Sequence, residues 1–274
     1  DMYASVNAQT ALIEECNKTL ANILEYTKEE IIGRPVIDIY HPDCLEEAKN
    51  AFKLFLETGE VNDKELQLRR KDGSKLDVSL NASSVRGENG RILHSRSILH
   101  DTTERTRNNA INSVRWHLLQ FAATHSLDEL LEETLNEVEK LTDSCIGFYH
   151  FVEEDQKTLT LQNWSTRTKA HFCKAEGKGQ HYPIAVAGVW VDCVSEGKPV
   201  VHNDYDSLPH RKGMPPGHAE VIRELVVPVY RGDKIKAILG IGNKSTDYTE
   251  KDVETTSLLA DLAWEVAERK RAEE

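Results

Sequence analysis

The chain has 274 residues, of which 29% are charged and 39% are hydrophobic, and this composition is ordinary for a globular protein of about two domains. Its formal net charge of −12 disfavours nucleic acid and anionic membrane surfaces as partners, because long-range repulsion opposes both. No apolar run is long enough to span a bilayer and no signal peptide begins the chain, so we expect a cytoplasmic location without membrane insertion. Because the first residue is Asp1 and not Met, we expect a piece of a larger protein.

Five cysteines are scattered through the chain without any CxxC or CxxCH spacing, at Cys16, Cys44, Cys145, Cys173 and Cys193. The spacing is untypical of a disulfide scaffold and of a structural zinc site, which needs closely spaced ligand pairs. A reducing compartment fits the pattern best.

The first third of the chain alternates strand and helix signals. Residues 2–8 and 11–17 predict two short strands, and residues 17–33 predict a helix. A second helix begins at Pro42, carries an apolar stripe and ends at Gly59. The predicted order is therefore a strand pair followed by helices.

The period of the apolar residues then changes to two. Residues 66–80 alternate around the turn KDGS, which predicts a hairpin, and residues 92–99 predict a third strand. A strand pair, helices and a three-stranded meander thus follow one another.

This order, with the segments CNKTLANILEYTKEEIIGRPVIDIYHPD, KDGSKLDVSLNAS and HDTTER, resembles a PAS domain over residues 1–104. A flavin-photosensing PAS domain carries a reactive cysteine where this chain reads GRPVIDIY, so that chemistry is absent. We expect the PAS core to be empty or filled by its own side chains, and to serve dimerisation and signal relay.

A long helical stretch follows the PAS segment. Ile111, Val114, Leu118 and Phe121 have the three-four spacing that is typical of the seam of a two-stranded coiled coil. We expect residues 105–125 to form a helical linker with the first helix of the next domain, through which two copies dimerise. The alternative is that the stripe packs on its own domain.

The end of the chain repeats the pattern. Leu259, Leu262 and Val266 lie on one helix face, followed by the polar tail AERKRAEE. Because that tail can bury nothing itself, we expect residues 269–274 to begin a helical linker to a missing downstream module, either a kinase or a further sensor.

Between the helical stretches, five segments are strand-like, so we expect a central sheet. The arrangement resembles a GAF domain over about residues 110–268, with residues 126–268 as the domain itself, ending in a C-terminal helix. The motifs that carry the resemblance are HYP (181–183), AGVWVDC (187–193), HNDY (202–205), KGMPPGH (212–218), VPVYRGDKIKAILGIGNK (227–244) and DYTEKD (247–252). They are similar to those of GAF domains beside PAS modules in archaeal and bacterial sensor histidine kinases.

The resemblance implies a pocket, because in GAF domains the segment between the middle and late strands folds over the sheet and closes a cavity. Aromatic rings would supply contact area there, and Asp, His and Asn groups would fix the orientation of a small ligand. For each residue the alternative is a packing, capping or turn role. The candidate ligand-binding residues are Trp164, His181, Tyr182, Trp190, Asp192, Cys193, His202, Asn203, Asp204 and Tyr205.

Haem is an alternative occupant, because some resembling GAF domains in sensor kinases of methanogenic archaea are associated with haem. An axial ligand must project a His or Cys into an apolar cavity. The candidates are His181, His202, His218, Cys173 and Cys193. The sequence does not decide the cofactor, and it predicts no other metal site.

Catalytic motifs are missing from the sequence. It has no GxxxxGK[ST], GxGxxG or GxSxG, and neither His117 nor His125 has the context of a phosphoacceptor histidine. We therefore predict an α+β chain of two domains, PAS then GAF, each an antiparallel sheet flanked by helices, joined by a long helical linker. The predicted function is that of a sensory fragment, with a histidine kinase as parent, that detects a small ligand or redox state in the GAF pocket. The competing functions are a haem-based redox or gas sensor and a purely structural dimerisation module.

Overall fold

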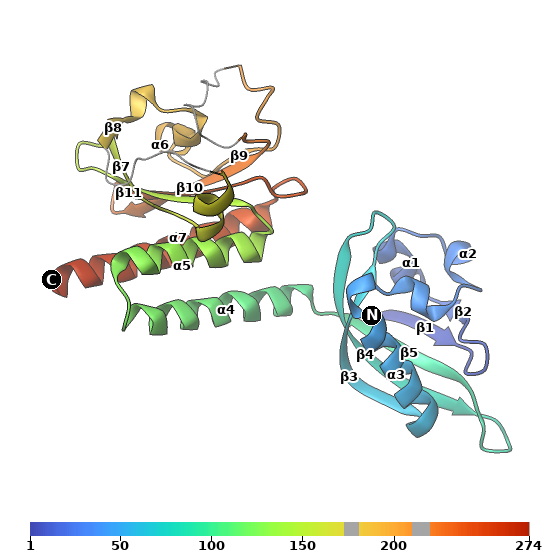
Figure 1. Cartoon of the computed structure of the whole chain (residues 1–274). Helices are drawn as coiled ribbons and strands as arrows, with labels where there is room; N and C mark the ends of the chain where they lie inside the picture. Colours follow the sequence, from blue (N-terminus) through green and yellow to red (C-terminus); the bar gives the residue numbers. More distant parts are fainter. Residues whose placement is uncertain (173–180, 210–219, 274) are drawn as a thin grey trace. The chain divides into compact units, whose positions relative to one another are not determined.

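The computed structural model describes residues 1–172, 181–209 and 220–273, and it divides into two compact units, Asp1–Asn109 and Ala110–Glu274. Each unit is an antiparallel sheet flanked by helices (Figure 1), so the predicted α+β class is confirmed. Among the described residues, no helix is both long and apolar enough to cross a membrane.

The first unit has a five-stranded sheet in the order β2-β1-β5-β4-β3, and every neighbouring pair is antiparallel. Its helices pack on one face of the sheet, where the apolar side chains of the alternating strands are buried. Its elements in chain order are β1 (Met2–Val6), β2 (Ile13–Cys16), α1 (Lys18–Leu24), α2 (Lys28–Ile31), η1 (Val36–Ile39), η2 (Pro42–Cys44), α3 (Leu45–Thr58), β3 (Glu60–Arg69), β4 (Lys75–Arg86) and β5 (Ile92–Asp101).

The helices of this unit show where local sequence signals act. The single helix predicted over 17–33 is instead two, because Glu25 takes a left-handed conformation with φ of 63° and ends α1. A capping box then begins α2: the Thr27 side chain accepts from the Glu30 N–H, and the Glu30 carboxylate accepts from the Thr27 N–H. At the end of α3, Gly59 has a φ of 85°, a conformation that favours glycine.

The second unit has a six-stranded sheet in the order β8-β7-β6-β11-β10-β9. Helices α5 and α7 lie on one face, with α4 beyond α5, and the segment with η5 and α6 lies on the other face (Figure 1), so two apolar clusters form, one on each side. Its elements are α4 (Thr103–Ala122, which begins in the first unit), α5 (Leu127–Thr142), β6 (Ile146–Val152), β7 (Thr158–Trp164), η3 (Thr168–Phe172), β8 (His181–Pro183), η4 (Ile184–Val186), η5 (Val189–Val191), α6 (Asp192–Glu196), β9 (Val200–His202), β10 (Glu224–Arg231), β11 (Lys234–Gly242) and α7 (Glu250–Glu273).

The two apolar stripes predicted as coiled-coil seams have another role. Val114 and Leu118 on α4, and Leu259 and Leu262 on α7, are buried in the same cluster of the second unit. The alternative, that these stripes pack on their own domain, therefore holds for these four residues, and a coiled coil through the two helices stays a prediction. The long helical stretch also breaks before Ser126, whose side chain caps α5 together with Glu129.

Candidate functional site

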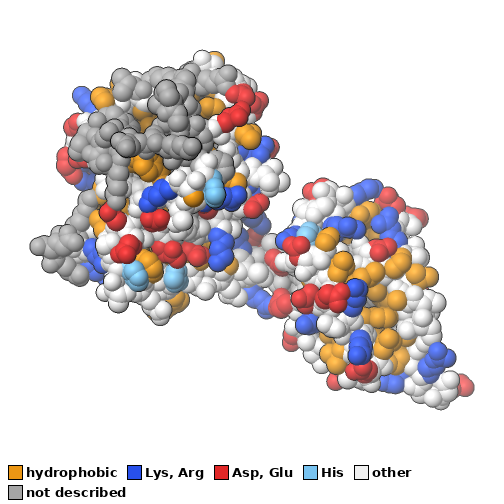
Figure 2. All heavy atoms as spheres, viewed as in Figure 1, with side chains coloured by type: hydrophobic (Ala, Val, Ile, Leu, Met, Phe, Trp, Pro, Cys, Tyr) orange, Lys and Arg blue, Asp and Glu red, His pale blue; other side chains and the backbone are white. Residues whose placement is uncertain are grey.

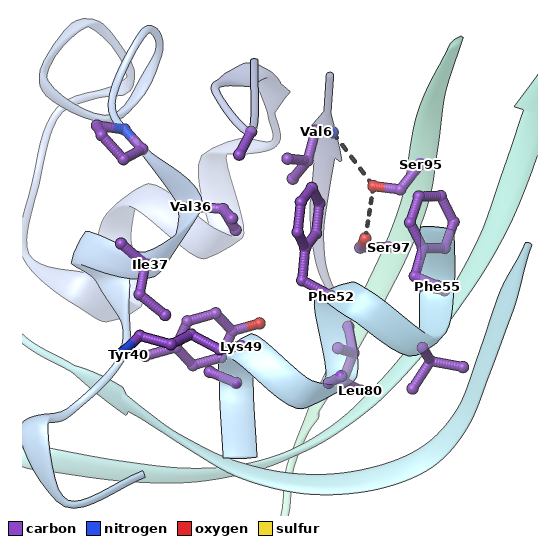
Figure 3. Close-up of a pocket in the computed structure, with 16 residues that line it drawn as sticks. Val6, Val36, Ile37, Tyr40, Lys49, Phe52, Phe55, Leu80, Ser95 and Ser97 are labelled. Carbon is purple, nitrogen blue, oxygen red and sulfur yellow. Dashed lines mark hydrogen bonds between the residues drawn. The ribbon is translucent and has the colours of Figure 1, made fainter. Parts of the chain in front are cut away.

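The clearest cavity among the described residues lies inside the first unit, between α3, η1 and the sheet (Figure 3). Its volume is about 270 Å3. Its walls are almost entirely apolar and leave this space between them, so of the two alternatives expected for the PAS core, empty or filled by its own side chains, the second does not hold. The lining residues are Val6, Ala11, Pro35, Val36, Ile37, Tyr40, Ala48, Lys49, Ala51, Phe52, Phe55, Val61, Leu80, Ala82, Ser95 and Ser97.

Two serine hydroxyls are the polar exception on the sheet side of this cavity. Ser95 and Ser97 are two residues apart on β5, so both side chains face the interior, and their Oγ atoms lie 2.9 Å apart. The Val6 N–H donates to Ser95 Oγ at 3.2 Å (Figure 3). Ser95 thus makes two of these hydrogen bonds and Ser97 makes one, so the Ser97 hydroxyl keeps the greater hydrogen-bonding capacity for a molecule in the cavity.

The charged end of the cavity is marked by Lys49. Its ammonium group lies 2.6 Å from a carboxylate oxygen of Glu46, and its side chain is more than half exposed. The cavity thus has an apolar body, one hydroxyl pair and one cation at its edge, which are the features of a small-molecule site.

In the second unit the residues predicted as a ligand pocket fall into three groups. The first is aromatic and centres on Trp190 of η5. Its ring stacks on the His150 ring at 4.8 Å with an interplanar angle of 30°, and it meets the Phe148 ring edge-on at 5.8 Å. Burial lowers the pKa of His150 to about 3, so this imidazole is neutral at physiological pH.

The second group is ionic and centres on His202 of β9. His202 Nδ1 lies 2.9 Å from Glu224 Oε1, and His202 Nε2 lies 3.7 Å from Asp192 Oδ2. His202 and Glu224 are register partners on neighbouring strands, and their side chains are 11% and 4% exposed. The hydrogen bond to Glu224 raises the pKa of His202, while burial raises the pKa of Glu224 and its bond to His202 offsets part of that rise.

The third group is structural. Asn203 Nδ2 donates to the Tyr248 carbonyl at 3.1 Å, and the Tyr248 N–H donates to Asn203 Oδ1 at 2.7 Å. Asp204 accepts from the Ser207 N–H at 3.3 Å, and Tyr205 is buried. These residues fasten the segment after β9.

Cys193 also belongs to the interior. It is fully buried in the cluster that covers the η5 side of the sheet. Burial raises the pKa of the Cys193 thiol far above its usual range, so it stays protonated and does not act as a nucleophile at neutral pH.

The other predicted site residues are described less fully. Trp164 lies in register with Phe148 on the neighbouring strand. His181 and Tyr182 belong to β8, which pairs with β7. Cys173 and His218, two of the haem-ligand candidates, lie outside the described residues.

Haem ligation can be tested on the two candidates whose side chains are described. Both ring nitrogens of His202 face carboxylates, and the Cys193 thiol is enclosed by apolar side chains. In this arrangement neither group fits an axial ligand, which must project into a cavity.

Sequence reasoning missed three kinds of site residue, although each leaves a signal. Glu224 begins the otherwise apolar strand ELVVPVY, and His150 interrupts the apolar run IGFYHFV. Ser95 and Ser97 share one face of β5. A polar residue at a position where the pattern demands an apolar one is the common signal.

The folds and these sites together define a pair of sensory domains. The chain matches the PAS domain family over residues 1–104 and the GAF domain family over residues 124–268. It belongs to the GAF family, with a PAS domain before the GAF domain, and the predicted PAS–GAF order is confirmed.

One curated relative spans both domains. The "methyl sulfide methyltransferase-associated sensor" of Methanosarcina acetivorans is 30% identical over 269 residues, which cover 95% of this chain and 26% of the relative. The chain thus spans about a quarter of the length of that protein.

Two solved structures are similar to parts or all of the chain. The GAF domain of an Acinetobacter phosphoenolpyruvate-protein phosphotransferase is 15% identical with a TM-score of 0.50, covering 61% of this chain and 95% of that one. The chromophore-binding domain of an unusual bacteriophytochrome from R. palustris is 13% identical with a TM-score of 0.44, covering 99% and 94%. The first likeness concerns the fold alone.

Proposed function

We propose that this chain is the ligand-sensing part of a signal-transduction protein, and that its PAS cavity binds a small, mainly apolar molecule with one hydrogen-bonding group. The sensory role rests on the two domain families and on the relative named as a sensor. The observation that carries the choice of site is the cavity of about 270 Å3 with the Ser95–Ser97 hydroxyl pair.

The lining of the cavity indicates an apolar ligand with one polar group. Filling an apolar cavity restores the dispersion contacts that its lining lacks, and a buried hydroxyl gains from a polar partner. A cavity of about 150 Å3 already holds benzene in another protein, so a volume of about 270 Å3 has room for a substituted ring or a short branched chain.

Titration with benzene and phenol, followed by NMR of the whole chain, tests this proposal. Phenol should bind more tightly than benzene, because its hydroxyl can bond to Ser97. In Ser97→Ala the phenol affinity should fall by about fivefold, the equivalent of about 1 kcal/mol, while benzene is unaffected.

A filled-cavity variant is the matched control. Ala48→Phe places a ring in the cavity and should abolish binding of both probes while circular dichroism shows that the fold is kept. Equal binding of both probes by the wild type and Ala48→Phe would contradict the proposal.

The GAF pocket predicted from the sequence is a second candidate site. One observation favours it: the half-buried ring of Trp190 lies over His150 in the segment expected to close that pocket. An absorption spectrum of protein made with haem precursor, oxidised and then reduced, separates the candidates. A stoichiometric Soret band that shifts on reduction would favour the haem sensor, and protein absorbance alone would favour a colourless ligand.

We further propose that two copies associate through α4, in the cytoplasm. The support is the outer face of α4, where Trp116 is 68% exposed and Leu119 is 40% exposed, three residues apart. A ligand would act by changing the packing of this helix, and a histidine kinase downstream would respond.

The association is tested by the mass of the chain in solution. Leu119→Glu should convert a dimer into a monomer, whereas Leu93→Glu, at a similarly exposed apolar position on the PAS unit, should not. A wild-type chain that is monomeric at high concentration would contradict the dimer and leave the ligand proposal standing.

A further inference from the structure

Helices α4 and α5 bring three metal-ligating side chains together on the surface of the second unit. His117 Nε2 on α4 lies 2.8 Å from Glu133 Oε1 on α5. Glu137 follows one turn later on α5, and one ligand atom from each of the three residues lies within 4.8 Å of the other two. Figure 2 shows histidine and acidic side chains gathered over this region.

The two carboxylates are not ordinary solvated surface charges. The side chains of Glu133 and Glu137 are only 25% and 16% exposed. They are four residues apart on one helix, a spacing at which like charges repel. Lys140 lies 3.8 Å from Glu137, but its side chain is 77% exposed, so water screens its charge. Lys140 therefore offsets the charge of Glu137 only weakly.

We propose that His117, Glu133 and Glu137 bind a divalent transition-metal ion of the zinc class. An imidazole nitrogen with two carboxylates is a donor set that Zn2+ accepts, whereas Ca2+ and Mg2+ prefer oxygen ligands alone. The ligand atoms lie within 4.8 Å of one another, so adjustments of the three side chains can bring them around one tetrahedral ion, with water in the fourth position. The Phe121 ring, 5.8 Å from the His117 ring, limits the orientations of the imidazole.

The position of the site gives the ion a role. His117 is on α4, which runs from the PAS unit into the GAF unit, and both glutamates are on α5 of the GAF unit. The bound ion fastens the GAF-proximal half of α4 to α5 by coordination, in addition to the apolar contacts of Val114 and Leu118. Metal occupancy thus sets how firmly the connecting helix is held.

Calorimetric titration of the metal-stripped whole chain with Zn2+ tests the site. The wild type should bind one equivalent more than His117→Ala, and Glu137→Gln should weaken the same site at least tenfold. Other thiols and imidazoles of the chain can also bind zinc. The test is therefore the difference in the number of zinc ions bound by the wild type and by His117→Ala. His100→Ala is the matched control, since His100 Nδ1 lies 3.0 Å from a single carboxylate, that of Asp1, and should keep the full count.

A second measurement separates coordination from a structural role of the His117–Glu133 hydrogen bond. Zn2+ should slow amide exchange in α4 and α5 of the wild type, and it should leave exchange in His117→Ala unchanged. Equal zinc stoichiometry and equal protection in the wild type, His117→Ala and Glu137→Gln would overturn the proposal.

Discussion

The interiors of the two domains differ in the polar groups that they bury. The PAS interior surrounds its cavity with apolar walls, and its polar members on the sheet side are the uncharged Ser95 and Ser97. The GAF interior buries ionisable groups beside its apolar clusters, among them Glu139, His150 and Glu224. The first interior suits an uncharged apolar guest, whereas the second couples its stability to protons.

The buried carboxyl of Glu139 shows how the GAF interior treats charge. It lies at the end of α5, accepts a short hydrogen bond from the Ser165 hydroxyl and is near the Thr168 hydroxyl. Burial raises the pKa of Glu139, and these hydroxyls and the nearby charge of Arg167 offset part of that rise. The surroundings of Glu139 are also closely packed, because a Cβ added at Gly147 would lie 2.9 Å from its carboxylate.

The largest loss of stability is predicted for a substitution that disrupts the ionic group around His202 in the GAF domain. His202→Leu removes the imidazole that faces the buried Glu224 carboxylate and leaves Asp192 nearby, and it should cost about 3–5 kcal/mol of unfolding free energy near neutral pH. All four tryptophans of the chain are in the GAF unit, so tryptophan fluorescence during urea unfolding reports on it.

The pH dependence of that cost identifies its origin. Because the pKa of His202 is raised in the folded state, its stabilisation is complete below the pKa of an unfolded histidine and is lost as pH rises through the raised value. The difference between wild type and His202→Leu should therefore shrink at alkaline pH. A cost that is the same at every pH would instead indicate lost packing, and the exposed His100→Leu should cost little.

The next prediction compares the effect of adding side-chain volume to the interior of each domain. A Cβ at Gly240 would lie 2.0 Å from Phe148 Cζ, and the Phe148 ring is held by Trp190 and His150. Gly240→Ala should therefore cost about 1–3 kcal/mol by overpacking. Ala48→Leu extends into the PAS cavity and should be neutral or stabilising by about 0.5–2 kcal/mol.

Thermal unfolding of both variants tests this contrast. The PAS domain lacks tryptophan, so its transition is followed by circular dichroism. Equal losses in Gly240→Ala and Ala48→Leu would mean that the PAS interior is as closely packed as the GAF interior.

A comparable effect concerns the segment after β9. Asn203→Ala removes both hydrogen bonds to the Tyr248 backbone and should destabilise the GAF unit by about 1–3 kcal/mol, because buried backbone groups lose their partners. Asn203→Asp keeps the acceptor for the Tyr248 N–H and should recover part of the loss. Indistinguishable urea midpoints for Asn203→Ala and the wild type would show that this contact does not stabilise the fold.

The smallest effects are matched across the domains. Thr27 caps α2 in the PAS unit and Ser126 caps α5 in the GAF unit, each within a capping box. Replacing either by Ala should cost about 1 kcal/mol. Only Ser126→Ala should shift the tryptophan transition if the units unfold separately, and a shift in both variants would show that they unfold together.

Much of the fold was predictable, because the elements carry strong periodic signals. The alternation over 66–80 gave β3 and β4, and the apolar run IGFYHFV matches β6. The break at Glu25 was not predicted, since a non-glycine residue with positive φ has no strong sequence signal. The capping box at Thr27 was the available clue.

The candidate sites were less predictable than the elements, because a site depends on which residues meet. The three-four stripe of Val114 and Leu118 reads the same whether its partner is a second chain or the same domain. The pairing of His202 with Glu224 depends on strand register across a long insertion, and the cavity depends on volume left between elements. Neither quantity is encoded in local periodicity.

Tyr248 is where the segment after β9 meets the helices. It lies shortly before the start of α7, and its backbone is held by Asn203. Its hydroxyl lies 2.9 Å from Oγ of Ser144, which follows the end of α5. A force applied at Asn203 therefore reaches the C-terminal end of one helix and the N-terminal end of another through a single side chain. A displacement of Tyr248 would therefore act on the ends of the two helices, where backbone groups lack partners within the helix, and not on their packed faces.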